Sequence, residues 1–239
     1  NAPTALQALL PAAQQGRELP HESALLHVTG AATYTDDIPE LRGTLYAALV
    51  LSPVAHGELI GEGIDRTALL AQHGVVAVFT AQDIPGENNC GPIIHDDPFL
   101  AAGKVEFLGQ PVAVVVARGA AQAQQAAQAV ELDIEALPPV LDFDEGDAAV
   151  TTGHQVGTVE PAPGGQTVEV TLDVPRVLAF PMEPRTVLAR WEAGNDNADA
   201  RLLVWLGTQA PSRARADIAA ALGWDEARVR VISGNVGGA

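Results

Sequence analysis

A strand–turn–helix–strand pattern that runs into a glycine-rich stretch is the feature that most limits how this chain can fold. Residues 202–206 (Leu-Leu-Val-Trp-Leu) are apolar and stop at a glycine, as is typical of a buried strand. Pro211 donates no N–H and ends the strand ladder. Ser212 is the predicted N-cap of the helix that follows, and Gly223 is its predicted C-terminal glycine. Residues 229–232 then return as a strand, so this region must combine helix and strand.

The glycine-rich stretch has a physical use beyond turning the chain. Residues 233–239 (Ser-Gly-Asn-Val-Gly-Gly-Ala) lack bulky side chains, which lets backbone N–H groups approach an anionic or oxo-bearing ligand closely. Gln209, in the turn before the helix, adds a neutral amide that both donates and accepts hydrogen bonds. On the glycines alone, an ordinary glycine-rich turn is the simpler interpretation. The surroundings of the motif therefore decide between the two.

In order and spacing, these motifs resemble a known family. Residues 208–211 (Thr-Gln-Ala-Pro), the intervening helix and residues 236–239 (Val-Gly-Gly-Ala) are similar to the first molybdenum-cofactor domain of the xanthine dehydrogenase/aldehyde oxidase family, which includes carbon monoxide dehydrogenase large subunits. The resemblance implies that Gln209 faces the molybdenum oxo group. It also implies that the loop holding the metal end of molybdopterin begins at Gly237, Gly238 and Ala239. The Phe-Gly that completes the family's loop motif would follow position 239.

Composition excludes several other classes of protein. The chain has 30 acidic and 13 basic residues, a net charge of -17, which argues against nucleic-acid partners and anionic membrane surfaces. No run approaches the roughly 18 apolar residues of a membrane span, and no signal peptide opens the chain, so we expect a cytoplasmic protein. The single cysteine, Cys90, excludes an internal disulfide. Its irregular spacing from His95, Asp96 and Asp97 leads us to predict no metal-ligand set.

Strand and helix patterns are intermixed through the first half of the chain, which indicates an α+β or α/β domain. The resemblance assigns residues 21–141 to the family's α/β hammerhead domain, chiefly through residues 28–38 and 108–117. We predict buried strands over residues 44–51, 75–80 and 109–117, a helix over 120–130 and a half-buried strand over 132–135.

Four segments are predicted along the chain. Residues 1–20 are predicted to form a partly ordered leader, and Asn1-Ala2 could be the remnant of a cleaved purification tag. Residues 21–141 form the predicted hammerhead domain. Residues 142–166, rich in Pro, Gly and acidic groups, form a linker, and residues 167–239 begin the cofactor domain. The predicted fold class is α+β: a hammerhead domain followed by a truncated mixed α/β molybdenum-cofactor domain. The missing initiator methionine and the ending at Ala239 suggest a fragment of a larger protein.

Strands are also predicted over residues 168–174 and 186–191. Three polar features outside the cofactor motif have simple structural interpretations. Adjacent residues on an extended chain point to opposite faces, so Asp36 and Asp37 suit a turn or cap better than a shared ligand. His56, a lone histidine after a strand, suits a structural hydrogen bond, and Glu183 suits an ion pair with Arg185.

The resemblance implies a molybdenum hydroxylase large subunit that hydroxylates carbon next to nitrogen or oxygen. The start of the chain is closer to xanthine dehydrogenases, which act on purines or other N-heterocycles. Residues 180–185 and 208–211 are closer to the aldehyde oxidase or carbon monoxide dehydrogenase branch, so an aldehyde substrate is the alternative. Implied cofactors of the full protein are molybdopterin, iron–sulfur clusters and FAD, the latter two on other domains or subunits. The full enzyme is expected to be a homo-oligomer.

The same resemblance places the family's catalytic glutamate beyond residue 239, so no catalytic residue is assigned here. The 239 residues alone are therefore expected to be inactive and to hold no cofactor. A hypothesis of a different class is a non-catalytic, acidic binding or scaffold protein for a basic partner, with the glycine-rich end a mere tail. A reading frame that continues past residue 239 with Phe-Gly and several hundred more residues would favour the enzyme over the binding protein.

Overall fold

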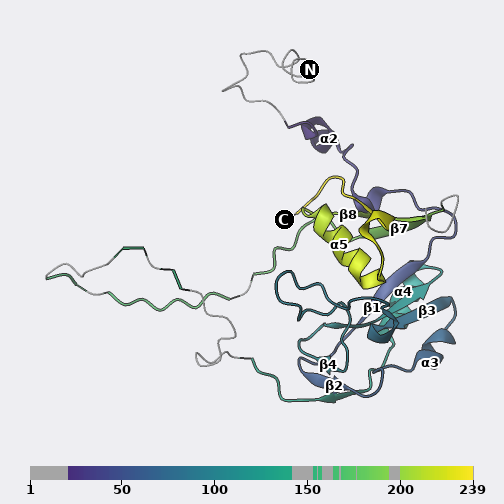
Figure 1. Cartoon of the computed structure of the whole chain (residues 1–239), viewed down its shortest axis with the longest axis horizontal. Helices are drawn as coiled ribbons and strands as arrows, with labels where there is room; N and C mark the ends of the chain where they lie inside the picture. Colours follow the sequence, from purple (N-terminus) through teal and green to yellow (C-terminus); the bar gives the residue numbers. More distant parts are fainter. Residues whose placement is uncertain are drawn as a thin grey trace, which may run out of the picture.

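The computed structural model describes residues 21–141, 153–154, 156–157, 164–166, 168–175, 177–193 and 200–238 (Figure 1). The predicted leader, most of the predicted linker and Ala239 lie outside the described residues. The helices and strands, in chain order, are α2 (Ala24–Thr29), η1 (Thr35–Asp37), β1 (Tyr46–Leu51), β2 (Gly57–Leu59), α3 (Arg66–Leu70), β3 (Val75–Thr80), η2 (Ala81–Asp83), β4 (Lys104–Val105), β5 (Pro111–Ala117), α4 (Ala120–Gln128), β6 (Ile134–Ala136), β7 (Val187–Glu192), β8 (Arg201–Leu206), α5 (Pro211–Leu222), η3 (Glu226–Arg228) and β9 (Val229–Ile232).

An antiparallel sheet of order β1-β5-β3 forms the centre of the first half of the chain. β5 is the middle strand, and its Val112, Ala113 and Val115 are fully buried, because one face packs on α4 and the other on the neighbouring sheet. The predicted strands at 75–80 and 109–117 and the predicted helix at 120–130 are confirmed, each within a few residues. The strand at 44–51 was predicted to be buried, but Leu49 and Leu51 are exposed because only one face of β1 packs on the core.

The second sheet has the order β4-β2-β6 and is antiparallel. Gly57 in β2 has no room for a side chain, since a Cβ there would lie 2.8 Å from the carbonyl oxygen of Glu135. The fully buried Val105 of β4 and Val112 of β5 belong to one apolar cluster, which joins this sheet to the first. The short strand β6 corresponds to the half-buried strand predicted at 132–135.

The third sheet, of order β7-β8-β9, has mixed directions: β7 and β8 are antiparallel, whereas β8 and β9 are parallel. Helix α5 connects the two parallel strands. Its C-terminal Gly223 has φ 64°, as the sequence predicts, but the predicted N-cap Ser212 is wrong. Pro211 occupies the first turn because its missing N–H costs nothing there, so Ala210 becomes the N-cap and Ser212 lies inside the helix.

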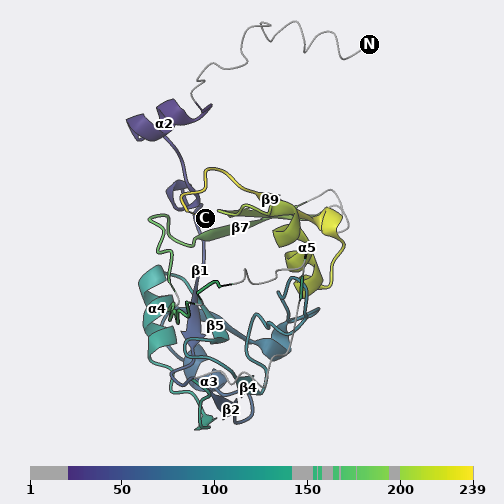
Figure 2. The same ribbon diagram turned by 90° about the vertical axis from the view of Figure 1, so that its left-hand side faces the viewer.

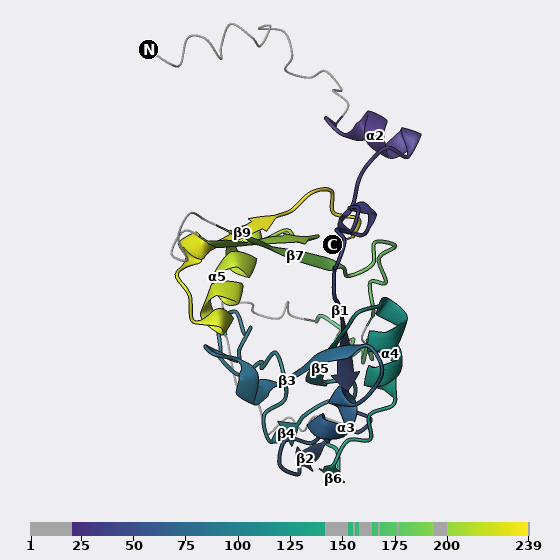
Figure 3. The same ribbon diagram turned by 90° about the vertical axis from the view of Figure 1, so that its right-hand side faces the viewer.

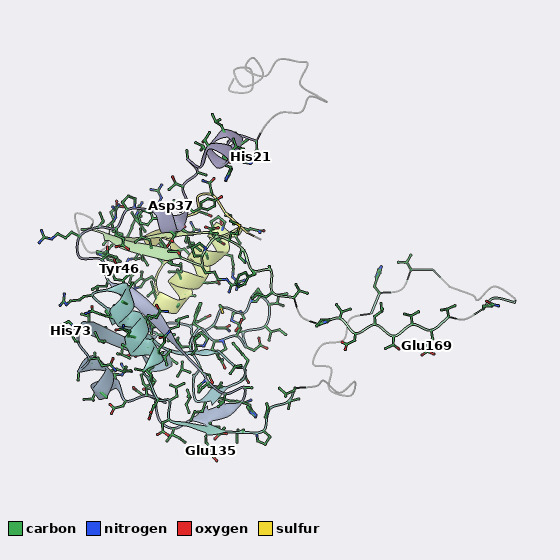
Figure 4. All side chains as sticks on the ribbon, turned by 180° about the vertical axis from the view of Figure 1, so that it is seen from behind. His21, Asp37, Tyr46, His73, Glu135 and Glu169 are labelled. Atoms are coloured by element: carbon green, nitrogen blue, oxygen red, sulfur yellow. The ribbon has the colours of Figure 1, made fainter. Side chains whose placement is uncertain are left out.

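The strand predicted at residues 168–174 is wrong. The segment is extended, but no other described segment pairs with it, and Val168 and Leu172 are about four-fifths exposed. Figure 4 shows Glu169 on this segment, projecting away from the body of the molecule. An alternating pattern determines which side chains share a face, whereas a strand also requires a neighbour for its N–H and C=O groups. No helix in the described part of the chain is long and apolar enough to cross a membrane.

The loop after β3 joins the first half of the chain to the third sheet at the end of α5 (Figures 2 and 3). The N–H groups of Gly86 and Glu87 donate to the carbonyl oxygens of Ala221 and Ala220 at 2.9 and 3.0 Å. These carbonyls belong to the last turn of α5, where few N–H donors of the helix remain. The Ala220 oxygen also accepts the Gly223 N–H at 3.1 Å. The guanidinium of Arg213 donates to two carbonyls further along the same loop. The loop therefore completes the hydrogen bonding of this helix.

Candidate functional site

Two loops leave the same edge of the third sheet because β8 and β9 are parallel. Residues 207–210 follow β8, and residues 233–238 follow β9. The Ser233 hydroxyl donates to the Thr208 carbonyl oxygen at 2.9 Å and accepts the Thr208 N–H at 3.3 Å. One side chain thus ties the two loops together. The predicted glutamine motif and the predicted glycine motif lie on loops that share one edge of the sheet.

Gln209 lies in the turn between β8 and α5. The Thr208 hydroxyl accepts the Ala210 N–H at 3.1 Å, which fixes the backbone on both sides of Gln209. Gln209 itself is exposed and makes no hydrogen bond with any other described residue. No side chain caps the N-terminus of α5, which begins two residues later and carries partial positive charge. A neutral amide and an uncapped helix end therefore stand side by side at this edge.

Gly237 and Gly238 are glycines because the loop packs closely against residues 181–183. A Cβ on Gly237 would lie 2.7 Å from the Cβ of Glu183, and one on Gly238 would lie 2.2 Å from the Cβ of Pro181. Neither glycine has the positive φ that itself favours glycine. Close approach of another chain segment, rather than backbone conformation, therefore requires glycine here. Ala239, the third predicted residue of this loop, lies outside the described residues.

Glu183 occupies the space between the two loops, and sequence reasoning missed this role. Its carboxylate accepts a hydrogen bond from the Gly237 N–H. On the other side, a Cβ on Gly207 would lie 2.8 Å from its Oε1 atom, so a side chain there would displace the carboxylate. The predicted ion pair with Arg185 is wrong, since no such pair forms among the described residues. The glycines at 207 and 237 were the available signal, but nothing local links them to Glu183.

The segment around η1 also contacts this edge, although it precedes the first sheet in the chain. The Asn235 side-chain amide donates to the Thr33 carbonyl oxygen at 2.9 Å. Asp36 accepts a 3.1 Å hydrogen bond from the Thr186 hydroxyl just before β7. Asp37, which Figure 4 shows beside the third sheet, accepts the Tyr34 N–H at 2.9 Å and so caps η1. The predicted cap role is confirmed for Asp37, whereas the Asp36 side chain instead joins η1 to the turn before β7.

The remaining polar candidates have local structural partners. His56 Nδ1 lies 2.9 Å from the Pro138 carbonyl oxygen, which confirms the predicted structural hydrogen bond. The Cys90 thiol donates to the Asp97 carbonyl oxygen, and burial raises its pKa, so that the thiol stays protonated and unreactive near neutral pH. Within the described ranges, no three His, Cys, Asp or Glu side chains could together hold a metal ion.

Two sequence models of protein families match consecutive parts of the chain. Residues 29–138 match the model described as "Aldehyde oxidase and xanthine dehydrogenase, a/b hammerhead domain", and residues 144–239 match the "Molybdopterin cofactor-binding domain". The chain belongs to the xanthine dehydrogenase and aldehyde oxidase family. The resemblance and the α+β fold class predicted from the sequence are confirmed. Members of this family are molybdenum-dependent oxidoreductases.

Individual relatives agree with this family. The chain is 32% identical to a xanthine dehydrogenase from Oryza sativa subsp. japonica over 93% of its length, and 42% identical to a nicotinate hydroxylase from Emericella nidulans over 54%. It spans only 17% and 10% of those proteins. Among solved structures, quinoline 2-oxidoreductase from Pseudomonas putida superposes with a TM-score of 0.74 at 30% identity, covering 93% of this chain and 30% of that one.

Proposed function

We propose that this chain is part of a molybdenum hydroxylase large subunit that hydroxylates a ring carbon next to nitrogen in a heterocycle. In this proposal, the edge formed by the turn at Gln209 and the loop at Gly237–Gly238 binds the metal end of molybdopterin. The observation that carries the proposal is the parallel pairing of β8 and β9, which brings both loops to one edge in a region that matches a molybdopterin-binding domain.

The residues at this edge fit such a cofactor chemically. The metal end of molybdopterin bears oxo and sulfur ligands, which accept hydrogen bonds and carry negative charge. The Gln209 amide is an uncommitted donor, and the N-terminus of α5 favours negative charge beside it. Gly238 is exposed and makes no hydrogen bond to other described residues through its N–H, so this N–H is available to a ligand. Among the described residues, Glu183 is the only one whose carboxylate bonds to these two loops, and it accepts the Gly237 N–H.

Each residue then has a defined task. Gln209 donates a hydrogen bond that orients the metal end without adding charge. Gly238 and Ala239 supply backbone contacts and clearance, whereas the Ser233–Thr208 hydrogen bonds hold the two loops in register. The cofactor, when bound, supplies the two-electron oxidation that introduces oxygen at the ring carbon. No residue of this chain is proposed as the catalytic acid or base.

A heterocyclic substrate is supported by the names of three relatives: a xanthine dehydrogenase, a nicotinate hydroxylase and a quinoline 2-oxidoreductase. An aldehyde is the second candidate, because aldehyde oxidases from Cavia porcellus and Rattus norvegicus are 34% and 35% identical to the chain over 94% and 93% of its length. The overall sequence identities to these relatives do not decide between a heterocyclic and an aldehyde substrate. Iron–sulfur and FAD components are the proposed electron acceptors, and a homo-oligomer is the proposed assembly.

The test uses the full-length protein purified with its partner components. We expect stoichiometric molybdenum and pterin, and faster oxidation of xanthine, nicotinate or quinoline than of benzaldehyde. Gln209→Ala should lower kcat/KM by about 100-fold, the usual effect of removing one oriented hydrogen-bond donor at a reacting centre. Gln124→Ala is the control and should leave kcat/KM unchanged, because Gln124 is an exposed amide on α4 whose side chain makes no hydrogen bond to described residues. Absence of molybdenum from the full-length protein would refute the proposal, and faster aldehyde oxidation would favour the second candidate.

A further inference from the structure

We propose that Glu183 is a positioning residue that sets the shape of the glycine loop and decides which of its N–H groups faces the cofactor. The contact between the Glu183 carboxylate and the Gly237 N–H is present in the chain itself. Its consequence for cofactor binding rests on the function proposed above.

The start of β7 and the ends of β8 and β9 meet at the edge where Glu183 lies. β7 runs antiparallel to β8, with Val187 opposite Leu206, so the start of β7 lies where β8 ends. Since β9 is parallel to β8, its end lies at this edge as well. Glu183 precedes β7 by four residues, and its side chain reaches the loop after β9. A single side chain therefore joins the entrance of β7 to the exit of β9.

The backbone that carries Glu183 is itself held in place. The Thr186 N–H donates to the Pro184 carbonyl oxygen at 2.9 Å, which forms a tight turn before β7. The Thr186 hydroxyl donates to Asp36 at 3.1 Å, which ties this turn to the η1 segment. Pro184 also restricts the backbone conformation of Glu183. The backbone from which the carboxylate projects is consequently held in place, and the Gly237 N–H is the hydrogen-bond partner of the carboxylate among the described residues.

The space around the carboxylate is matched to it on both sides. A Cβ at Gly207 would lie 2.8 Å from Oε1, and a Cβ at Gly237 would lie 3.3 Å from Oε2. The two flanking glycines leave room for the carboxylate in its observed position, and a side chain at either would press against it. This arrangement gives the two glycines a common purpose, which is to accommodate Glu183.

The contact changes the role assigned to Gly237. An N–H that already donates to a carboxylate in the chain is not available to a ligand, so Gly237 shapes the loop instead of contacting the cofactor. The next N–H, that of Gly238, has no partner among the described residues and remains available. Removing the carboxylate would leave the Gly237 N–H without its acceptor and let the loop move.

The experiment uses the full-length enzyme in its complex and two independent perturbations of the contact. Glu183→Ala removes the acceptor, whereas Gly207→Ala displaces the carboxylate from the opposite side. Glu183→Gln keeps an acceptor oxygen of the same reach and should restore part of the effect. Glu192→Ala is the matched control, because Glu192 is an exposed glutamate on β7 whose side chain makes no hydrogen bond to described residues.

Two measurements are made on every variant: hydrogen–deuterium exchange of the peptide that contains residues 233–238, and molybdenum per subunit. Glu183→Ala and Gly207→Ala should speed exchange of the Gly237 amide by about tenfold, the loss expected for one hydrogen bond. Both should also retain less than about half of the wild-type molybdenum, with Glu183→Gln in between and Glu192→Ala unchanged.

Unchanged exchange in both Glu183→Ala and Gly207→Ala would overturn the contact. Faster exchange with undiminished molybdenum would overturn the positioning role. If Glu183→Ala does not fold, Gly207→Ala and Glu183→Gln still decide the question. A wild-type enzyme without molybdenum would refute the proposed function instead, and the exchange measurement would still test the Glu183 contact by itself.

Discussion

Substitution of Gly86 by alanine should weaken the contact between the first half of the chain and the third sheet. Gly86 donates its N–H to the Ala221 carbonyl oxygen, and the neighbouring Glu87 donates to Ala220. A Cβ on Gly86 would lie 1.9 Å from the Ala220 carbonyl oxygen and 2.7 Å from the Gly223 nitrogen. Both are backbone atoms of a helix end, so they cannot rotate away as a side chain could. The loop must therefore move off α5.

The size of the effect follows from what the movement breaks. Each of the two backbone hydrogen bonds contributes about 0.5–1.5 kcal/mol net, and forcing a methyl group into packed structure costs about 1–3 kcal/mol. A destabilisation of about 3 kcal/mol is therefore expected. For a protein of this size, each kcal/mol lowers Tm by roughly 2–4 °C, so Tm should fall by about 6–12 °C.

Tryptophan fluorescence is a suitable assay, because all three tryptophans lie in the third sheet or just after α5: Trp191, Trp205 and Trp224. Thermal melts of the wild type and Gly86→Ala should show the loss in Tm directly. Gly153→Ala is the control, since a Cβ there meets nothing within 4 Å and the residue does not have positive φ. A Gly86→Ala melt within about 1 °C of the wild type would refute the reasoning, because a clash with helix backbone cannot be absorbed without cost.

Three further outcomes are expected. The Arg66 guanidinium, by donating to Asp83, lowers the pKa of that carboxyl; the ion pair therefore stabilises the fold above the unfolded-state pKa of about 3.9, and that contribution is lost as pH falls through the lower folded-state pKa. Asp83→Asn should lower the free energy of unfolding by about 1 kcal/mol at pH 7. In urea melts this difference from the wild type should become smaller at acid pH. A difference that stays constant with pH would contradict the role of the ion pair. Gln110 is almost fully buried and its side-chain oxygen accepts the Glu106 N–H at 2.7 Å, so Gln110→Leu should cost about 1–3 kcal/mol in the same melts, and an unchanged midpoint would contradict this role. Residues 1–239 expressed alone should carry no stoichiometric molybdenum by elemental analysis and oxidise neither xanthine nor benzaldehyde. Stoichiometric molybdenum, or oxidation of either substrate, would contradict this expectation.

Most of the longer helices and strands could be predicted, in their order, from the sequence. The apolar run at 109–117 can only be buried on both faces, and it forms β5 at the centre of its sheet. Alanine and glutamine favour the helix that follows, and Gly223 ends α5 because only glycine adopts its left-handed conformation without cost. The motifs of the candidate site could also be identified from the sequence, as a glutamine after one strand and glycines after the next.

Contacts between residues far apart in the chain could not be predicted, because a local sequence pattern does not identify the partner residue. The alternation at 168–174 predicted a strand, but no described neighbour completes its hydrogen bonds. Glu183 was assigned to its near neighbour Arg185, whereas its partner Gly237 lies 54 residues away in the chain.

The sequence by itself therefore determined most of the longer elements and their order, with a glutamine after one strand and glycines after the next, because these follow from propensity, periodicity and glycine or proline chemistry. Only the tertiary structure decided that Glu183, Ser233 and the η1 segment hold that edge together. Such contacts depend on the parallel pairing of β8 and β9 and on the antiparallel return of β7, which bring residues far apart in the chain within hydrogen-bonding distance.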